Sequence, residues 1–314
     1  MNFLSKTFLA MATVCCFSSL AQAAGYYAGC EEESVMLECP FEGLHVTGRY
    51  LYVQPTGDQL FSSLNQNATF GDGFFLAFGY HFGNDSDLTA NWTFFKSDTK
   101  RIVVPEAAAL LPDPFSRERV DDRLHSINLE FGQTSHWGEF VEVRFHTDLN
   151  YTHISRGRSF FAQQYRYSQR FNGFGPRLGA DLNYSIGASG LTLIGQANVG
   201  LLFGESRLNG VNTLFGEDGE IIAIGPIRSN TEVVTPVFEW RLGAEYIFEL
   251  STGYLSIQGG YQWVSYLQVL QYPNLTQTPG LAQTPALGGT VFGERNNFGY
   301  HGFYIGLRWQ GEWV

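Results

Sequence analysis

The sequence is poor in charge, and in basic charge above all. Charged residues make up 16% of the 314 residues, against about 25% in an average soluble protein. The 19 Lys and Arg against 30 Asp and Glu give a formal net charge of −11, which argues against a nucleic acid as partner. Aromatic residues reach 16%. This excludes a disordered chain, because disorder accompanies high charge and few aromatics.

Long apolar runs are also missing, and the one near the N-terminus is short. Lys6 precedes an apolar stretch over residues 8–20, which is too short to cross a bilayer as a helix. Ala21-Gln22-Ala23 then supplies the small residues that a signal peptidase requires. We therefore expect residues 1–23 to be a cleaved signal peptide, with a buried N-terminal helix as the alternative.

Cysteine is scarce, with four residues, of which Cys15 and Cys16 fall in the predicted signal peptide. Cys30 and Cys39 remain in a predicted periplasmic N-terminal segment, residues 24–42. In an exported chain two cysteines at this spacing predict a disulfide. Metal binding is the alternative, but two thiolates supply only half of a structural zinc site.

The remaining chain alternates apolar and polar residues with a period of two, which is typical of β-strands. Over residues 141–151 the odd positions are mostly apolar, while the even positions are Glu142, Arg144, His146, Asp148 and Asn150. The same alternation recurs at 74–82, 174–184, 191–203, 236–248, 255–263 and 303–309, and less clearly at 88–94 and 127–131. Residues 46–53 are ambiguous, because both faces carry apolar side chains. Most of these ten predicted strands have about 9–13 residues, and a tilted strand needs about 9–11 to cross a bilayer.

The predicted connections alternate between short and long. Short ones lie at 83–87, 133–138, 186–190 and 251–253, and long ones at 55–72, 97–121, 152–170, 205–231 and 264–297. Outer-membrane barrels have short periplasmic turns and long extracellular loops. We therefore predict an all-β, transmembrane, antiparallel up-and-down barrel over residues 43–314, in the outer membrane of a Gram-negative bacterium. Ten strands fit best, with eight or twelve as alternatives.

A soluble β-sandwich is the alternative architecture, since it also alternates apolar and polar residues. Its outward face should carry more charge than this chain has, and its loops have no reason to alternate in length. Both features favour the barrel, in which one face of each strand meets lipid and the other meets the interior.

The inward faces carry opposite charges on neighbouring strands. The predicted lumen-lining residues are Glu142, Arg144, Asp148, Arg177, Asp181, Glu239, Arg241, Glu245 and Arg308, with Glu130, Glu249 and Arg49 on the same face. An ion-pair network that fills a narrow barrel is one interpretation, because eight strands are just filled by side chains. A narrow aqueous path lined by charge, favouring cations, is the other.

Several segments carry a family resemblance. Residues 171–179 (FNGFGPRLG), 200–204 (GLLFG), 239–243 (EWRLG) and 302–309 (GFYIGLRW) resemble the Legionella-type major outer membrane protein family. The resemblance implies an outer-membrane barrel that is pore-forming, oligomeric and exposed at the cell surface, and it supplies no catalytic residues. A porin-like passive diffusion pore for small solutes or ions is the function we expect, and a surface adhesin or structural outer-membrane protein is the alternative.

The expected partners follow from this placement. They are outer-membrane lipid and lipopolysaccharide, small solutes or ions, a second copy of the chain, and a host surface ligand for the long loops. No cofactor and no nucleic acid is expected. The histidines show no metal-ligand spacing, so no metal site is expected either.

An outer-membrane enzyme is the remaining class. His153 and Ser155 share the outward face of one predicted strand, and a histidine beside a serine can activate the hydroxyl. The pair is similar to the His-x-Ser-Asn-Gly motif of outer-membrane phospholipase A, but Arg156-Gly157 stands where Asn-Gly is needed, and no orienting third group is evident. Asp121-Asp122 with His125 suggests a rim protease, with no specific spacing. We expect that the chain is not an enzyme.

Overall fold

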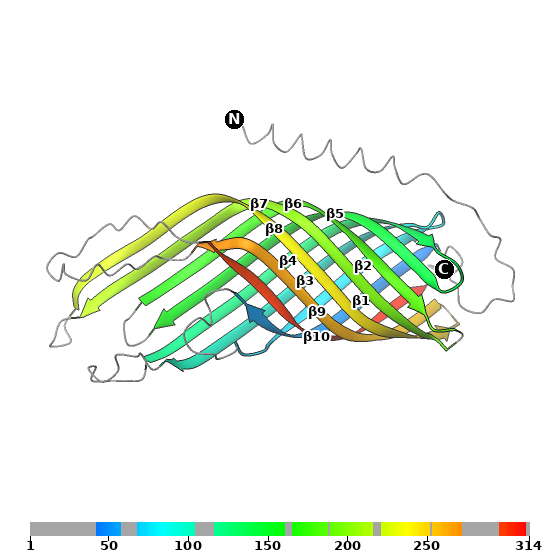
Figure 1. The fold of residues 1–314 in the computed structure, drawn as a ribbon, viewed down its shortest axis with the longest axis horizontal. Helices are drawn as coiled ribbons and strands as arrows, with labels where there is room; N and C mark the ends of the chain where they lie inside the picture. Colours follow the sequence, from blue (N-terminus) through cyan, green and yellow to red (C-terminus); the bar gives the residue numbers. More distant parts are fainter. Residues whose placement is uncertain are drawn as a thin grey trace, which may run out of the picture.

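The structure, a computed structural model, describes residues 42–57, 68–103, 116–160, 165–187, 189–215, 221–251, 253–271 and 295–311. These residues form ten strands in one closed antiparallel sheet (Figure 1). The strands are β1 (Gly43–Thr56), β2 (Gly71–Phe82), β3 (Ser86–Val103), β4 (Ser116–His136), β5 (Val141–Phe160), β6 (Tyr165–Ser185), β7 (Leu191–Phe215), β8 (Ile221–Leu250), β9 (Gly253–Gln271) and β10 (Arg295–Gly311). Within the described residues no helix is long and apolar enough to cross a membrane. The predicted signal peptide and the Cys30–Cys39 disulfide lie outside the described residues.

The barrel closes by pairing its first and last strands. β1 runs antiparallel to β10, with Tyr50 opposite Ile305, and every other strand pairs with its neighbours in the chain. Closure matters because an open sheet edge would leave backbone N–H and C=O groups unpaired in lipid. The ten-stranded up-and-down barrel predicted from the sequence is confirmed.

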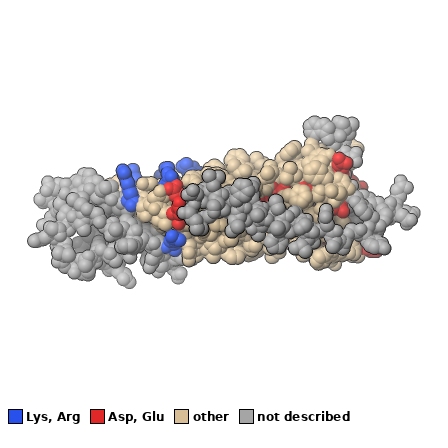
Figure 2. Space-filling model, turned by 90° about the horizontal axis from the view of Figure 1, so that it is seen from above, with Lys and Arg blue, Asp and Glu red and all other residues tan. Residues whose placement is uncertain are grey.

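The outward face of the barrel is apolar over its middle. Leu242, Phe303 and Ile305 each have 59% of their surface exposed, although water would penalise this heavily. On the face visible in Figure 2, Lys and Arg are confined to one end of the described surface, and the middle carries none. Such an apolar belt is stable in hydrocarbon. Together with the closed sheet, it excludes the soluble β-sandwich.

The turns at one end of the barrel are short, as predicted. β2 and β3 are joined by residues 83–85, β4 and β5 by 137–140, and β8 and β9 by 251–252. Tight reversals need left-handed backbone, which Asp85 (φ 61°) and Gly138 (φ 77°) adopt. Glycine does so without strain, and aspartate is among the few other residues that tolerate it.

The strands run farther at the opposite end than the sequence indicated. β7 has 25 residues and β8 has 30, and much of the predicted loops 152–170 and 205–231 is strand. In Figure 1 these two strands reach the far left of the barrel. The period of two depends on apolar residues that face lipid, so it fades where the strand leaves the membrane. Cross-strand pairing needs no such pattern and continues, with Asn209 opposite Arg228.

Candidate functional site: the barrel lumen

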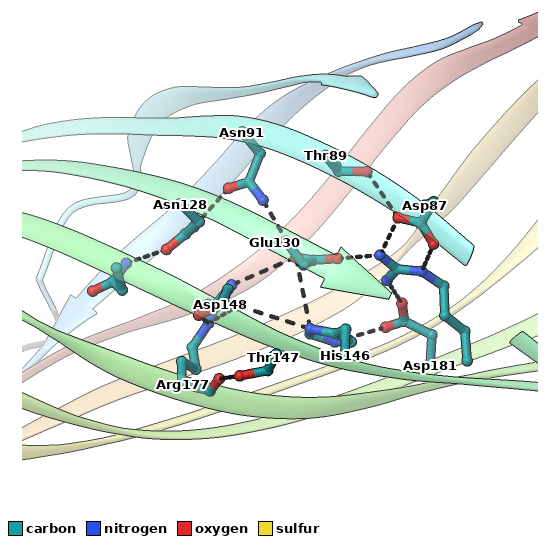
Figure 3. Close-up of polar contacts among 12 residues, drawn as sticks. Asp87, Thr89, Asn91, Asn128, Glu130, His146, Thr147, Asp148, Arg177 and Asp181 are labelled. Carbon is teal, nitrogen blue, oxygen red and sulfur yellow. Dashed lines mark hydrogen bonds and ion pairs between the residues drawn. The ribbon is translucent and has the colours of Figure 1, made fainter. Parts of the chain in front are cut away.

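Arg144 of β5 lies at the centre of the charged part of the lumen. Its Nε is 2.6 Å from Asp87 Oδ2, its Nη2 2.7 Å from Glu130 Oε1, and its Nη1 2.7 Å from Asp181 Oδ2 (Figure 3). The three carboxylates come from β3, β4 and β6. A planar guanidinium has five N–H donors in fixed directions, so one arginine can connect all three strands.

Arg177 of β6 makes a second such connection. Its Nε donates to Asp148 Oδ2 at 2.8 Å on β5, and its Nη1 donates to Glu239 Oε2 at 2.8 Å on β8. The second contact passes over β7, where Gly200 lies opposite Arg177. A Cβ on Gly200 would approach Arg177 Cβ to 3.2 Å. Glycine therefore gives the arginine room to reach across the lumen.

His146 lies between these two arginines, with its side chain fully buried. Its Nδ1 is 3.7 Å from both Glu130 Oε2 and Asp148 Oδ2, and its Nε2 is 3.8 Å from Asp181 Oδ1. These residue types can hold a metal ion, and the ligand atoms of Glu130, His146 and Asp148 lie within 4.8 Å of one another. The two guanidinium groups already bind these carboxylates and would repel a cation. The geometry therefore favours an ion-pair network.

A layer of asparagines follows the charged network along the barrel axis. Asn91, Asn128 and Asn150 lie opposite one another on β3, β4 and β5. Asn128 Nδ2 donates to Asn91 Oδ1 at 2.6 Å, Asn150 Nδ2 donates to Asn128 Oδ1, and Asn91 Nδ2 reaches Glu130 Oε2 at 3.5 Å. Through Asn91 and Glu130 this asparagine layer connects the charged network to the part of the lumen that lies toward the extended strand ends.

Beyond the asparagines the interior of the barrel carries a cluster of buried apolar side chains, which we call the apolar layer. Phe95, Leu124, Ile154 and Phe171 form one cross-strand row over β3 to β6, and each has 0% of its surface exposed. The layer is completed by Leu51, Val53, Leu202, Val233, Val237, Val264, Tyr266, Phe298 and Tyr300. Among the described strands β2 differs, because glycine faces the layer there. A Cβ on Gly71 would lie 2.9 Å from Phe95 Cε2.

One cavity of about 180 Å³ occupies the charged half. Its lining runs from Asp85 and His136, near the short turns, past Arg144 and Glu239 to Tyr266 and Tyr300 of the apolar layer. The cavity therefore ends where the apolar side chains begin.

The structure places all nine predicted lumen-lining residues on the inward face. Arg144, Asp148, Arg177, Asp181 and Glu239 join in the network described above. Four others contact uncharged groups: Asn183 Nδ2 donates to Glu142 Oε1 at 2.9 Å, Arg308 Nη2 donates to Gln310 Oε1 at 3.0 Å, Ser256 Oγ donates to Glu245 Oε1, and the Arg241 guanidinium lies 5.7 Å from the Tyr304 ring. Arg49 also faces inward and donates to Gln258 Oε1 at 2.6 Å. Glu249 is exposed beside a turn.

Sequence reasoning missed the apolar layer. It assigned inward positions to polar residues, so Phe95 and Phe171 had no place in the lumen. One signal was present: residues 46–53 carry apolar side chains on both faces. In the structure Tyr50 and Tyr52 face outward with nearly half their surface exposed, while Leu51 is 1% and Val53 0% exposed. A strand that is apolar on both faces indicates that the barrel interior is itself apolar at that level.

The outward face brings together one pair that the sequence singled out. His153 Nδ1 donates to Asn172 Oδ1 at 2.6 Å, so the orienting group that the sequence did not reveal comes from β6. The structure shows no hydrogen bond between His153 and Ser155 among the described residues. The other set does not converge, because Asp122 points inward to Arg156, at 2.6 Å, while His125 stacks outward with Trp92.

The family model of the Legionella pneumophila major outer membrane protein precursor matches residues 38–311. The chain belongs to this family. Membership gives the barrel its setting, the outer membrane of a Gram-negative bacterium, with outer-membrane lipid around its apolar belt. The end with short turns is then periplasmic, and the end with extended strands is extracellular.

Solved structures resemble this member of the family in shape at low identity. The outer membrane protease OmpT from Escherichia coli is 10% identical, with a TM-score of 0.48, over 88% of this chain and 99% of that one. The translocator domain of the autotransporter NalP from Neisseria meningitidis is 11% identical, with a TM-score of 0.35, over 97% and 96%. Ail of Yersinia pestis is 16% identical, with a TM-score of 0.26, over 66% and 99%. No curated protein matches the sequence.

Proposed function

We propose that this protein is a surface-exposed structural barrel of the outer membrane whose lumen is closed to solutes. The apolar layer carries the proposal. Fully buried side chains such as Phe95, Ile154 and Phe171 belong to one apolar cluster inside the barrel, in which the Phe95 ring stacks on Tyr300 of β10 with 5.5 Å between ring centroids. A hydrated solute would have to displace them. A hydrophobic constriction excludes water, and it therefore blocks ions even where it is wide enough for an ion to pass.

The length of the strands supports a role at the cell surface. β8 has 30 residues, whereas about 9–11 suffice to cross the membrane. The excess projects on the extracellular side as paired strands, which are stiffer than free loops. Such hairpins suit a scaffold that displays binding surfaces, as an adhesin does.

A porin-like diffusion pore is the second candidate, and the charged cavity supports it. About 180 Å³ of space lies among Arg144, Glu239 and their neighbours, enough for several water molecules. Acidic groups outnumber basic ones along the predicted lumen, so cations would be favoured. This function requires that the apolar layer move aside.

Planar-bilayer recordings of the refolded full chain test the choice between these functions. We expect no conductance steps from the wild type. The triple variant Phe95→Ala, Phe171→Ala, Phe298→Ala removes three rings from the layer and should conduct. A matched control, Phe145→Ala, Phe174→Ala, Phe303→Ala, removes three rings from the lipid face and should stay silent.

Two results would contradict the closed barrel. Conductance steps from the wild type would establish a pore. A layer variant that stays silent would show that the apolar layer is not the barrier, provided that heat-modifiable mobility on a gel shows that it is folded.

The expectation that the chain is not an enzyme remains a proposal. Asn172 orients His153, but catalysis also needs the histidine to take the proton of Ser155, and no contact between the two supports this. We expect no release of fatty acids from phospholipid vesicles. Release that disappears in Ser155→Ala would show that His153, Ser155 and Asn172 act together.

A further inference from the structure

On the outward face of β3 to β7, successive cross-strand rows along the barrel axis carry different types of side chain. An aromatic row crosses the five strands with Trp92, Ile127, Tyr151, Phe174 and Phe203 directly opposite one another. Two residues farther out, the next row contains His125, His153 and Asn172. Aromatic side chains of barrels gather where hydrocarbon meets headgroups. This row therefore marks the outer edge of the lipid belt.

A basic row lies two residues beyond the histidines. Lys96, Arg123, Ser155, Arg170 and Arg207 lie directly opposite one another across the same five strands. They are four residues from the aromatic row, which is about 13 Å along a strand at ~3.3 Å per residue. With the usual tilt of barrel strands this is about 10 Å along the membrane normal. The row therefore stands at the level of the outer-leaflet headgroups.

Most cations of the basic row have no acidic partner among the residues that the structure describes. Arg207 is held by Glu205, with Nε 2.8 Å from Oε2. For Lys96, Arg123 and Arg170 the structure gives no ion pair among the described residues. Asp72 lies opposite Lys96, but its carboxylate accepts a hydrogen bond from the Tyr50 hydroxyl.

Two rows farther out on β3 and β4, Lys100 and Arg119 are neutralised by the carboxylates of Asp98 and Asp121, which lie in the row between. Arg119 Nη2 lies 2.8 Å from Asp98 Oδ2, and its Nε lies 3.2 Å from Asp121 Oδ2. Lys100 Nζ is 3.9 Å from the same Asp98 carboxylate. On β3 and β4 the outer cations Lys100 and Arg119 are therefore neutralised, whereas Lys96 and Arg123 make no ion pair with any described residue. Figure 2 shows Lys and Arg gathered at this end of the molecule, beside the apolar belt.

Like charges directly opposite one another destabilise a sheet. Lys96 faces Arg123, and Arg123 and Arg170 flank Ser155 on either side. An anion above Ser155 would offset this repulsion. It would receive charge-assisted hydrogen bonds from two guanidinium groups, which suit phosphate because they can bind it with two parallel N–H donors.

We propose that the basic row binds a phosphate group of lipopolysaccharide, the phosphorylated glycolipid of the outer leaflet. Arg123 and Arg170 grip the phosphate from both sides, Ser155 donates its hydroxyl, and Lys96 adds charge. The acyl chains then lie along the aromatic row beneath. The site faces outward and does not depend on whether the lumen conducts.

Binding of fluorescent lipopolysaccharide to the refolded full chain in detergent micelles tests the proposal. The site variant is Lys96→Gln, Arg123→Gln, Arg170→Gln. The control is Lys100→Gln with Arg119→Gln, which removes two cations outside the basic row that already have acidic partners. We expect the site variant to bind on the order of tenfold more weakly or worse, and the control to change by less than about threefold. Heat-modifiable gel mobility checks that each variant is folded.

Three further measurements separate the sources of phosphate and guard against misfolding. Dephosphorylated lipopolysaccharide should bind the wild type as weakly as intact lipopolysaccharide binds the site variant. Millimolar inorganic phosphate should not compete, since the acyl chains hold the lipid in place. Arg123→Lys with Arg170→Lys keeps the charge and should retain part of the affinity. Equal binding by the site and control variants, or equal binding of the dephosphorylated lipid, would overturn the proposal.

Discussion

Charge is used in opposite ways on the two faces of this barrel. Inside, Asp148 is 3% and Arg177 is 7% exposed, and the two are hydrogen-bonded to each other. Outside, beyond the lipid belt, Arg119 and Asp98 pair with 44% and 31% of their side chains exposed. Between these regions the outward face carries apolar residues such as Leu242. An Arg–Asp pair therefore occurs both in the buried lumen and at the water-exposed surface, and the surroundings of each pair determine how much it contributes to stability.

The physical difference is desolvation. Removing two charges from water costs several kcal/mol per ion, and good geometry does little more than offset it. A buried pair therefore adds little net stability, but removing one partner leaves the other charge buried and alone. An exposed pair costs little to form, and water replaces a lost partner. The comparison predicts a graded series of effects.

The largest effect is expected from Arg144→Leu. The substitution leaves Asp87, Glu130 and Asp181 in the lumen without their shared donor, and it should lower the free energy of unfolding by about 3–5 kcal/mol. Urea unfolding of the refolded barrel in lipid vesicles measures it. A loss below about 1 kcal/mol would mean that water solvates the network well, so that the lumen resembles the surface.

This network shows how far the sequence could lead. Alternation over residues 141–151 predicted that Arg144 and Asp148 face inward, since a strand has only two faces. It could not predict which carboxylate each arginine binds, because that depends on the register between strands. Asp87, which lies 57 positions from Arg144 in the chain, was not among the predicted lumen-lining residues. Register also hid the rows that carry the basic site, since Arg123 and Arg170 become neighbours of Ser155 only in the folded sheet.

A smaller effect is expected when charge enters the lipid-facing belt. Leu242→Arg places a cation on the outward face of β8, where Leu242 is 59% exposed, and it should cost about 2–4 kcal/mol at the bilayer midplane. Glu245→Leu, on the inward face of the same strand, provides the comparison in the same vesicle assay. A greater loss for Glu245→Leu than for Leu242→Arg would contradict the assignment of the two faces.

The apolar layer shows where pattern reasoning fails on physical grounds. The period of two reports a difference between two solvents, lipid outside and water inside. Where the interior is itself apolar, as around Leu51 and Phe95, the difference vanishes and the pattern with it. The extracellular strand ends fail for the opposite reason, because both of their faces meet polar surroundings. The fold was nevertheless predicted correctly, because the number of strands and the positions of the turns follow from the lipid-facing belt alone.

The smallest effect is expected from Arg119→Gln, the exposed counterpart of Arg144→Leu. Arg119 lies 2.8 Å from Asp98, as close as Arg177 lies to Asp148 in the lumen, and 3.2 Å from Asp121. The loss should nevertheless be about 0–1 kcal/mol, because water solvates the carboxylates that remain. A double-mutant cycle with Asp98→Asn, read from the same urea unfolding curves, isolates the pair from other effects of each substitution. Added salt should reduce the coupling energy of this exposed pair far more than it reduces the effect of Arg144→Leu, since buried charges are poorly screened. A coupling energy as large as the loss in Arg144→Leu would mean that distance rather than solvent sets the strength of these pairs, and the contrast between the two faces would lose its physical basis.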